Sequence, residues 1–172
     1  MLEIRLAKIS DYEKIKELYY SVIDEMKDTL YDLGWEKDLY PSNQYIQQSI
    51  EDNQLYIGID NEKIVSTMIL NHHNNEEYKD VEWLVEASQE EVIVIHTLAV
   101  SPLFRSKGIA EKMVKDAIRL AEEKRYKALR LDVLKGNLPA MKLYEKVGFK
   151  HIDTRKVDVG DYLDFLIYEL EL

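Results

Sequence analysis

The chain has 172 residues, a formal net charge of −10 from 33 acidic and 23 basic side chains, and no cysteine. This length predicts a single domain, residues 1–172, with room for a full hydrophobic core. The lack of cysteine excludes a disulfide framework, a thiolate metal site and a cysteine nucleophile. The acidic balance disfavours nonspecific nucleic-acid binding and is compatible with a cationic substrate such as an amine.

The N-terminal residues, Met-Leu-Glu-Ile-Arg-Leu, lack the basic region and long apolar run of a signal peptide. No stretch approaches the roughly 18 apolar residues that a membrane span needs. The sequence therefore predicts a cytoplasmic protein that has no membrane partner.

The beginning of the chain is predicted to form a strand and a long helix. Residues 2–6 alternate between apolar and charged side chains, which indicates a half-buried strand. Ser10 and Glu13 have the spacing of a capping box, so a helix is expected to begin there. Its apolar residues keep helical spacing as far as Leu30.

An aromatic-rich connection, residues 31–40, follows this helix and precedes a shorter one that is expected from Pro41–Ser42 to about Ile50. Binding residues are often found on such connections, although aromatic side chains also cover the edges of a core. The candidates for an acceptor pocket come from this connection and from a later polar stretch: Tyr31, Trp35, Tyr78 and Trp83.

The middle of the chain is predicted to form an antiparallel hairpin from residues 55–59 and 64–70. A polar stretch with a short helix near residues 81–87 separates this hairpin from an apolar strand over residues 92–100. The apolar strand runs through a Pro-containing turn into a helix that starts at about Gly108.

The last part of the chain is predicted to alternate between strands and a helix. Residues 129–133 alternate as a strand, and a helix is expected over residues 139–147, with Asn137 as its cap and Gly148 just past its end. Two final strands complete the chain and could supply a homodimer surface, at residues 149–157 and 162–169.

The turn after the apolar strand is suited to bind phosphate. Gly108 and Ala110 are small, so a phosphate group can approach the backbone closely. The free amides and the dipole of the helix start favour negative charge. A pyrophosphate could be held there without a metal, although a tight packing contact would explain the small residues equally well.

This turn and a second motif about thirty residues later together resemble the GNAT superfamily of acyl-CoA N-acyltransferases. The residues that carry the resemblance are Arg105-x-x-Gly108-x-Ala110, then Asn137, Tyr144 and Gly148-Phe149. The resemblance implies an α/β (α+β) GNAT fold. Such a fold has a mixed, mostly antiparallel central sheet with a splayed parallel pair, and helices on both faces.

The resemblance also implies acetyl-CoA as the cofactor. The backbone of Leu98, Ala99 and Val100 would pair with the pantetheine arm, and an amide there would polarise the thioester carbonyl. Asn137 would bond the cofactor as well as cap its helix. The pyrophosphate would lie on the loop residues Arg105, Ser106, Lys107, Gly108, Ile109 and Ala110. The charges of Arg105 and Lys107 are also typical of a solvated turn.

Acetyl transfer to an amine requires a neutral nucleophile and a proton for the departing thiolate. Tyr144 is the expected general acid, since a phenol with a pKa near ~10 can protonate a thiolate; the alternative is a core aromatic residue. His96 is the candidate base and shares a predicted strand face with Leu98, although a histidine in an apolar strand is often a core residue. Glu90 and Glu91 are weaker candidates.

We therefore expect an acetyl-CoA-dependent N-acetyltransferase that acetylates a primary amine of a small molecule or peptide by direct ternary-complex transfer. The alternative is a non-catalytic acyl-CoA-binding sensor or regulatory module, which the presence of Tyr144 disfavours. No metal site is expected, because the adjacent His72 and His73 would point apart in an extended segment and have no third ligand.

Overall fold

The computed structural model describes residues 1–30 and 32–172. The chain divides into two compact units at three points, two of them in strands and one in a helix. The first unit consists of residues 1–70 and 96–116, and the second of residues 71–95 and 117–172.

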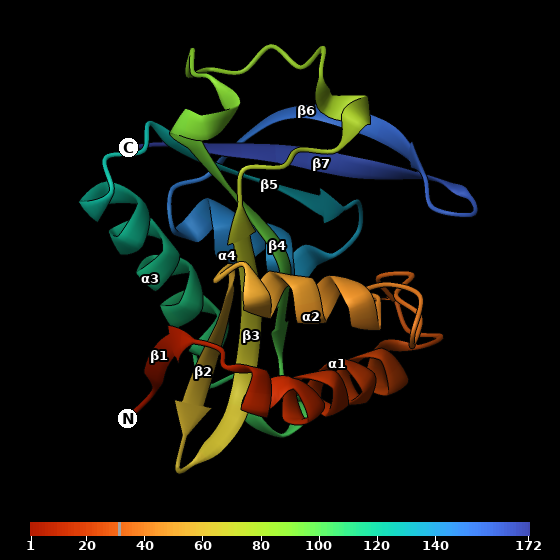
Figure 1. The fold of residues 1–172 in the computed structure, drawn as a ribbon. Helices are drawn as coiled ribbons and strands as arrows, with labels where there is room; N and C mark the ends of the chain where they lie inside the picture. The colour runs from red at the N-terminus through yellow and green to blue at the C-terminus, as the bar shows by residue number, and fades with distance from the viewer. Residues whose placement is uncertain (31) are drawn as a thin grey trace. The chain divides into compact units, whose positions relative to one another are not determined.

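The first unit is built on an antiparallel hairpin with an added edge strand. Its elements are β1 (Glu3–Leu6), α1 (Tyr12–Met26), α2 (Asn43–Glu51), β2 (Leu55–Asp60), β3 (Lys63–Asn71), the second half of β4 (Val92–Val100) and the first half of α3 (Ile109–Glu123) (Figure 1). Strand β2 pairs antiparallel with both β1 and β3. The predicted hairpin is confirmed, and its turn residues Asn61 and Glu62 both have positive φ, as a tight two-residue hairpin turn requires.

Helices cover both faces of the sheet in the first unit. Leu55 and Ile57 of β2 lie in a core cluster with Ile15 and Leu18 of α1 and with α2. Gly58 points the opposite way, since successive strand residues alternate. A Cβ atom at Gly58 would lie 3.1 Å from the sulfur of Met113 in α3. Helices α1 and α2 therefore pack on one face and α3 on the other.

The second unit contains the first half of β4, the end of α3 and four further elements: β5 (Ala128–Leu134), α4 (Leu138–Lys146), β6 (Lys150–Asp158) and β7 (Tyr162–Glu171). Strands β4 and β5 run parallel, while β7 pairs antiparallel with both β5 and β6. Because β4 belongs to both units, the strands form one sheet in the order β1-β2-β3-β4-β5-β7-β6. The predicted mixed, mostly antiparallel sheet with one parallel pair is confirmed.

A buried ion pair fixes the connection between β3 and β4 to the sheet of the second unit. The Nε of Arg130 lies 2.8 Å from a carboxylate oxygen of Glu169, and both side chains are at least 96% shielded from solvent. The backbone N–H of Val85 donates to Glu169 at 3.0 Å, and Arg130 donates to the carbonyl oxygen of Val85 at 3.1 Å. The ring of Trp83 lies 3.9 Å from the guanidinium carbon, which adds a cation–π contact.

This pair explains why the helix predicted near residues 81–87 is wrong. The backbone groups of Val85 bond to Glu169 and Arg130, so they are not available for a helical ladder. Two 3₁₀ turns lie in the connection instead, Glu76–Tyr78 and Gln89–Glu91.

Among residues 1–30 and 32–172, every helix is too short or too polar to cross a lipid bilayer.

Helix α1 also differs from its predicted bounds. It is preceded by a 3₁₀ turn, Ile9–Asp11, and it stops at Met26 because Lys27 leaves the helical conformation with a ψ of 133°. Leu30 is 92% exposed and lies outside the helix, so it is not part of the apolar stripe.

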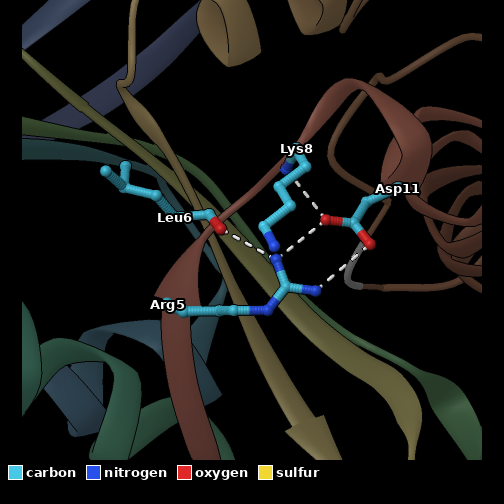
Figure 2. A network of polar contacts seen from close by, with 4 residues as sticks. All are labelled: Arg5, Leu6, Lys8 and Asp11. Atoms are coloured by element: carbon cyan, nitrogen blue, oxygen red, sulfur yellow. Dashed lines mark hydrogen bonds and ion pairs between the residues drawn. The ribbon is translucent and has the colours of Figure 1, made fainter.

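Asp11 closes the 3₁₀ turn that precedes α1, in place of the predicted box of Ser10 and Glu13. Figure 2 shows the Asp11 carboxylate between two donors: the backbone N–H of Lys8 donates at 2.8 Å, and the Arg5 guanidinium donates at 2.8 and 3.2 Å. Arg5 also donates to the carbonyl oxygen of Leu6 at 2.8 Å. The hydrogen bond from Arg5 lowers the pKa of Asp11 below its ordinary value.

Replacing Asp11 with alanine removes the partner of Arg5 and the acceptor for Lys8. We expect the free energy of unfolding to fall by about 1–3 kcal/mol, since hydrogen bonds to charged groups contribute about this much. Because the pKa of Asp11 is lowered by folding, this contribution is complete above the unfolded pKa of ~3.9 and is lost as the pH falls through the folded value. Urea unfolding at pH 7 and pH 3 measures both effects.

The matched control is Glu13→Ala in the first turn of the same helix, where Glu13 forms an exposed ion pair with Lys16. We expect a smaller loss of stability from this change, because exposed pairs contribute little. An equal loss from the two substitutions would contradict the role assigned to Asp11.

Candidate active site

The predicted phosphate loop is an exposed turn that leads into α3 in the first unit. Arg105 through Gly108 are all exposed, and both Ser106 and Gly108 have positive φ, +61° and +72°. Left-handed residues at such a turn aim successive backbone N–H groups into a concavity that suits an anion. A Cβ atom at Gly108 would meet nothing within 4 Å, so the space beside the glycine is open. The loop therefore fits a pyrophosphate group.

The two cationic side chains of the loop already have partners. Arg105 forms an ion pair with Glu25 of α1, with 2.8 Å between nitrogen and oxygen, and both side chains are largely exposed. The Nζ of Lys107 lies 4.6 Å from the centre of the Phe104 ring. A phosphate that recruits Arg105 must therefore compete with the Glu25 carboxylate.

A groove of about 860 Å³ adjoins the loop within the first unit. One face of α1, the β2–β3 turn and residues 101–104 line it. Glu25 and Phe104, the partners of the loop cations, are among its lining residues, and Leu103 at its edge is 84% exposed. The phosphate loop thus borders a concave, partly apolar surface.

The second half of β4 holds four residues relevant to the predicted site. His96, Leu98 and Val100 are half-buried, and Ala99 is buried. Thr97 has a φ of +48°, so the strand is not regularly extended at this position. Sequence reasoning missed this conformation. Burial nevertheless alternates through Thr97, since His96 and Leu98 are both half-buried whereas Thr97 and Ala99 are buried.

Helix α4 carries the second motif in the second unit. Asn137 caps the helix, since its side-chain oxygen accepts from the N–H of Ala140 at 3.3 Å. Gly148 follows the helix with a φ of +107°, as its predicted position required. Tyr144 is only 7% exposed and contacts the ring of Phe149 edge to face at 5.6 Å. Burial, and then the negative charge of Asp132, raise the pKa of Tyr144 well above its ordinary value.

Asp132 of β5 is a functional candidate that sequence reasoning missed. The phenol of Tyr78 donates to its carboxylate at 2.6 Å. The residue is exposed, yet desolvation by nearby protein atoms raises the pKa of Asp132. A carboxylate with a raised pKa is a better proton acceptor near neutral pH than an ordinary one. The signal in the sequence was a lone acidic residue between Leu131 and Val133, shortly before Asn137.

The four aromatic candidates for an acceptor pocket do not form one cluster. Trp35 lies in the first unit, where it contacts Tyr19 edge to face at 5.9 Å. Tyr78 and Trp83 lie in the second unit in a small core cluster, with Tyr78 bonded to Asp132 and Trp83 stacked on Arg130. Tyr31 lies outside the described residues.

The remaining polar candidates have partners elsewhere. The Nδ1 of His72 lies 2.7 Å from the carbonyl oxygen of Val92, whereas the ring of His73 lies near Gln89. Glu91 pairs with Lys127 at 2.8 Å, and this hydrogen bond lowers its pKa, which makes it a poorer base. Within residues 1–30 and 32–172, no three histidine or acidic side chains gather in a way that could hold a metal ion.

Comparison with known families identifies the class of this fold and loop. The family described as "Acetyltransferase (GNAT) family" matches residues 17–149, which is most of the chain and includes both motifs. The chain therefore belongs to the GNAT acetyltransferase family, as the two motifs predicted.

Individual relatives agree with this assignment. The [ribosomal protein bS18]-alanine N-acetyltransferase of Haemophilus ducreyi is 37% identical over 62 residues, which cover 36% of this chain and 43% of the relative. The chain spans less than half the length of the curated relatives that it matches.

Solved structures match over nearly the whole chain. A GNAT family acetyltransferase from Streptococcus agalactiae is 21% identical, with a TM-score of 0.83 over 99% of this chain and 95% of that one. The yncA protein of Salmonella typhimurium, solved with its cofactor acetyl-CoA, is 15% identical, with a TM-score of 0.70 over 100% of this chain and 94% of that one. At these identities the structures establish the shared fold.

The Glu25–Arg105 pair predicts how CoA affinity responds to mutation. Glu25→Gln releases Arg105 for phosphate, so we expect the Kd for CoA to fall about 2- to 5-fold at low salt, the range for an exposed ion pair. Isothermal titration measures this change. The control Glu123→Gln removes the same charge by breaking the exposed pair with Arg119 on α3. Equal effects of the two variants would mean that only net charge matters.

Proposed function

We propose that this chain transfers the acetyl group of acetyl-CoA to a primary amine of a small molecule or peptide. The observation that carries the proposal is the open, left-handed loop from Arg105 to Ala110 at the start of α3, in a chain of the GNAT family. The chain has no cysteine that could carry an acyl group, which supports direct transfer within a ternary complex.

The first unit would hold the cofactor. Acetyl-CoA, when bound, supplies an activated thioester. Backbone amides of the loop from Arg105 to Ala110 would bind its pyrophosphate, and Arg105 and Lys107 would add positive charge. The backbone of Leu98, Ala99 and Val100 would align the acyl arm and polarise the carbonyl through an N–H group.

Side chains of α4 and β5 would supply the proton transfers. Tyr144 is protonated at every physiological pH because burial raises its pKa, so it can serve as the donor to the leaving thiolate. Asn137, the cap of α4, would also bond the cofactor. We assign the base to Asp132, because desolvation raises its pKa and so suits a carboxylate that takes a proton from an ammonium group. The hydrogen bond from Tyr78 would hold the carboxylate in position. His96 is the competing candidate.

The acceptor class is an amine with a positive charge in its resting form. An amine with a pKa near ~10.4 must lose a proton before it attacks, at a cost of about 4.6 kcal/mol at pH 7. The carboxylate of Asp132 would attract the ammonium form and then accept that proton. The Haemophilus ducreyi relative is named for an alanine of a ribosomal protein, which supports a peptide amine as one candidate.

Cofactor binding is the first test. We expect saturable binding of CoA and acetyl-CoA to the wild-type protein by isothermal titration, and no binding to Gly108→Trp, whose side chain fills the open space beside the loop. The matched control is Gly160→Trp in the β6–β7 turn, where the glycine also has positive φ and open space around it. Both substitutions strain the backbone alike, so a selective loss in Gly108→Trp locates the site.

Failure of the folded wild-type protein to bind either ligand would overturn the proposed function. Binding without release of free thiol in the presence of peptide, polyamine and aminoglycoside amines would favour the non-catalytic acyl-CoA sensor. Equal binding by Gly108→Trp and Gly160→Trp would place the cofactor elsewhere.

Replacing Asp132 with asparagine should reduce acetyl transfer while preserving or raising stability. Loss of the base is expected to lower the rate about 100-fold or more and to abolish the fall in activity at acid pH. Because folding raises the pKa of Asp132, the folded state favours the neutral carboxyl, and its destabilising effect grows as the pH rises from the unfolded pKa of ~3.9 to the folded value. At pH 7, Asp132→Asn removes this penalty and still accepts from Tyr78.

Two further variants separate this role from general effects. Asp164 is held by Lys156 and Lys135, which lower its pKa, so Asp164→Asn should change stability in the opposite direction. His96→Gln should retain the acid limb of the pH–rate profile. If His96→Gln loses that limb and Asp132→Asn keeps it, the base is His96.

A further inference from the structure

Thr97 adopts a backbone conformation that is unfavourable for its residue type. Its φ of +48° lies in the left-handed region, where a β-branched side chain is a genuine outlier. Among the non-glycine residues of positive φ in residues 1–30 and 32–172, Thr97 alone lies inside a strand. Such a conformation is strained and persists only where neighbouring contacts enforce it.

Tyr19 of α1 provides that enforcing contact. Its hydroxyl donates to the carbonyl oxygen of Thr97 at 3.1 Å and lies 3.0 Å from the Thr97 Oγ1. The side chain is completely buried, and Trp35 packs against its ring. Burial raises the pKa of Tyr19 to about 12, so the phenol remains a hydrogen-bond donor across the physiological pH range. All three residues belong to the first unit.

The contact defines one end of a short backbone segment. A left-handed residue within a strand turns the peptide groups that follow it relative to a regular ladder. At the other end of the segment, the N–H of Ser101 donates to the carbonyl oxygen of Val65 in β3 at 2.8 Å. The backbone of Leu98, Ala99 and Val100 is therefore fixed between Tyr19 and Val65.

We propose that Tyr19 is a positioning residue for acyl transfer, which holds Thr97 in its left-handed conformation and so aims the following backbone at the thioester arm. This inference rests on the proposed function, which assigns Leu98–Val100 to that arm. Tyr19 acts through Thr97 and does not itself touch the reacting atoms. Without its phenol, Thr97 would relax towards the extended conformation that its side chain prefers.

The preference for acetyl-CoA over CoA tests this role without a known acceptor. A backbone N–H aimed at the acetyl carbonyl strengthens binding of acetyl-CoA only, whereas the phosphates contribute equally to both ligands. Tyr19→Phe keeps the ring and removes the hydroxyl. We expect the Kd for CoA to stay within about 2-fold, and the ratio of the CoA Kd to the acetyl-CoA Kd to fall about 3- to 10-fold, the effect of one hydrogen bond.

Tyr12→Phe is the matched control, because Tyr12 also lies in α1 and packs against the same core cluster. This control should retain the wild-type preference. Thr97→Val keeps the side-chain shape and removes the Oγ1 partner of Tyr19. This variant should also lower the preference for acetyl-CoA over CoA, and it replaces Tyr19→Phe in the test if Tyr19→Phe does not fold.

An unchanged preference in folded Tyr19→Phe, with both ligands still bound, would overturn the positioning role and leave the proposed function intact. The same holds for an unchanged preference in Thr97→Val when Tyr19→Phe is unfolded. Failure of the wild-type protein to bind either ligand would instead overturn both proposals.

Discussion

The buried ion pair between Arg130 and Glu169 determines the arrangement of the second unit. Desolvating two charges is costly, so such a pair persists only when further hydrogen bonds satisfy its remaining atoms. Here the backbone of Val85 supplies them, and Trp83 covers the guanidinium group. As a result, the long polar connection between β3 and β4 is held against the sheet of the second unit without an α-helix. Tyr78, on that connection, can then reach the Asp132 carboxylate on β5.

The proposed chemistry depends on two side chains whose pKa values are raised by desolvation, one as the proton donor and one as the base. Desolvation keeps Tyr144 protonated, which a donor needs, and it shifts Asp132 towards the neutral pH range, which a base needs. The loop from Arg105 to Gly108 is exposed instead, and the space beside Gly108 is open. This openness suits the entry and release of the large anionic group in the proposed function.

Local signals in the sequence predicted most of the fold. Asn137 and Gly148 mark the two ends of α4, and Gly108 marks the start of α3, because caps and left-handed turns depend on one or two residues. The missed features depend on contacts between distant residues. Tyr78 is 54 positions from Asp132, and Tyr19 is 78 positions from Thr97. Thr97 even contradicts local preference, since a threonine in an apolar strand predicts extended backbone. The predicted box at Ser10 and Glu13 missed the 3₁₀ turn before α1, in which Asp11 accepts from Arg5, six residues away, and from the backbone of Lys8.

Strand β6 lies at one end of the strand order, so one of its edges is free to pair with another chain. Charged side chains recur along this strand, from Lys150 to Asp158, and its register with β7 is interrupted between His151 and Asp153. Charged side chains and an irregular backbone both oppose the addition of a further strand. The exposed edge of β6 therefore has two features that disfavour growth of the sheet by addition of a strand from another chain.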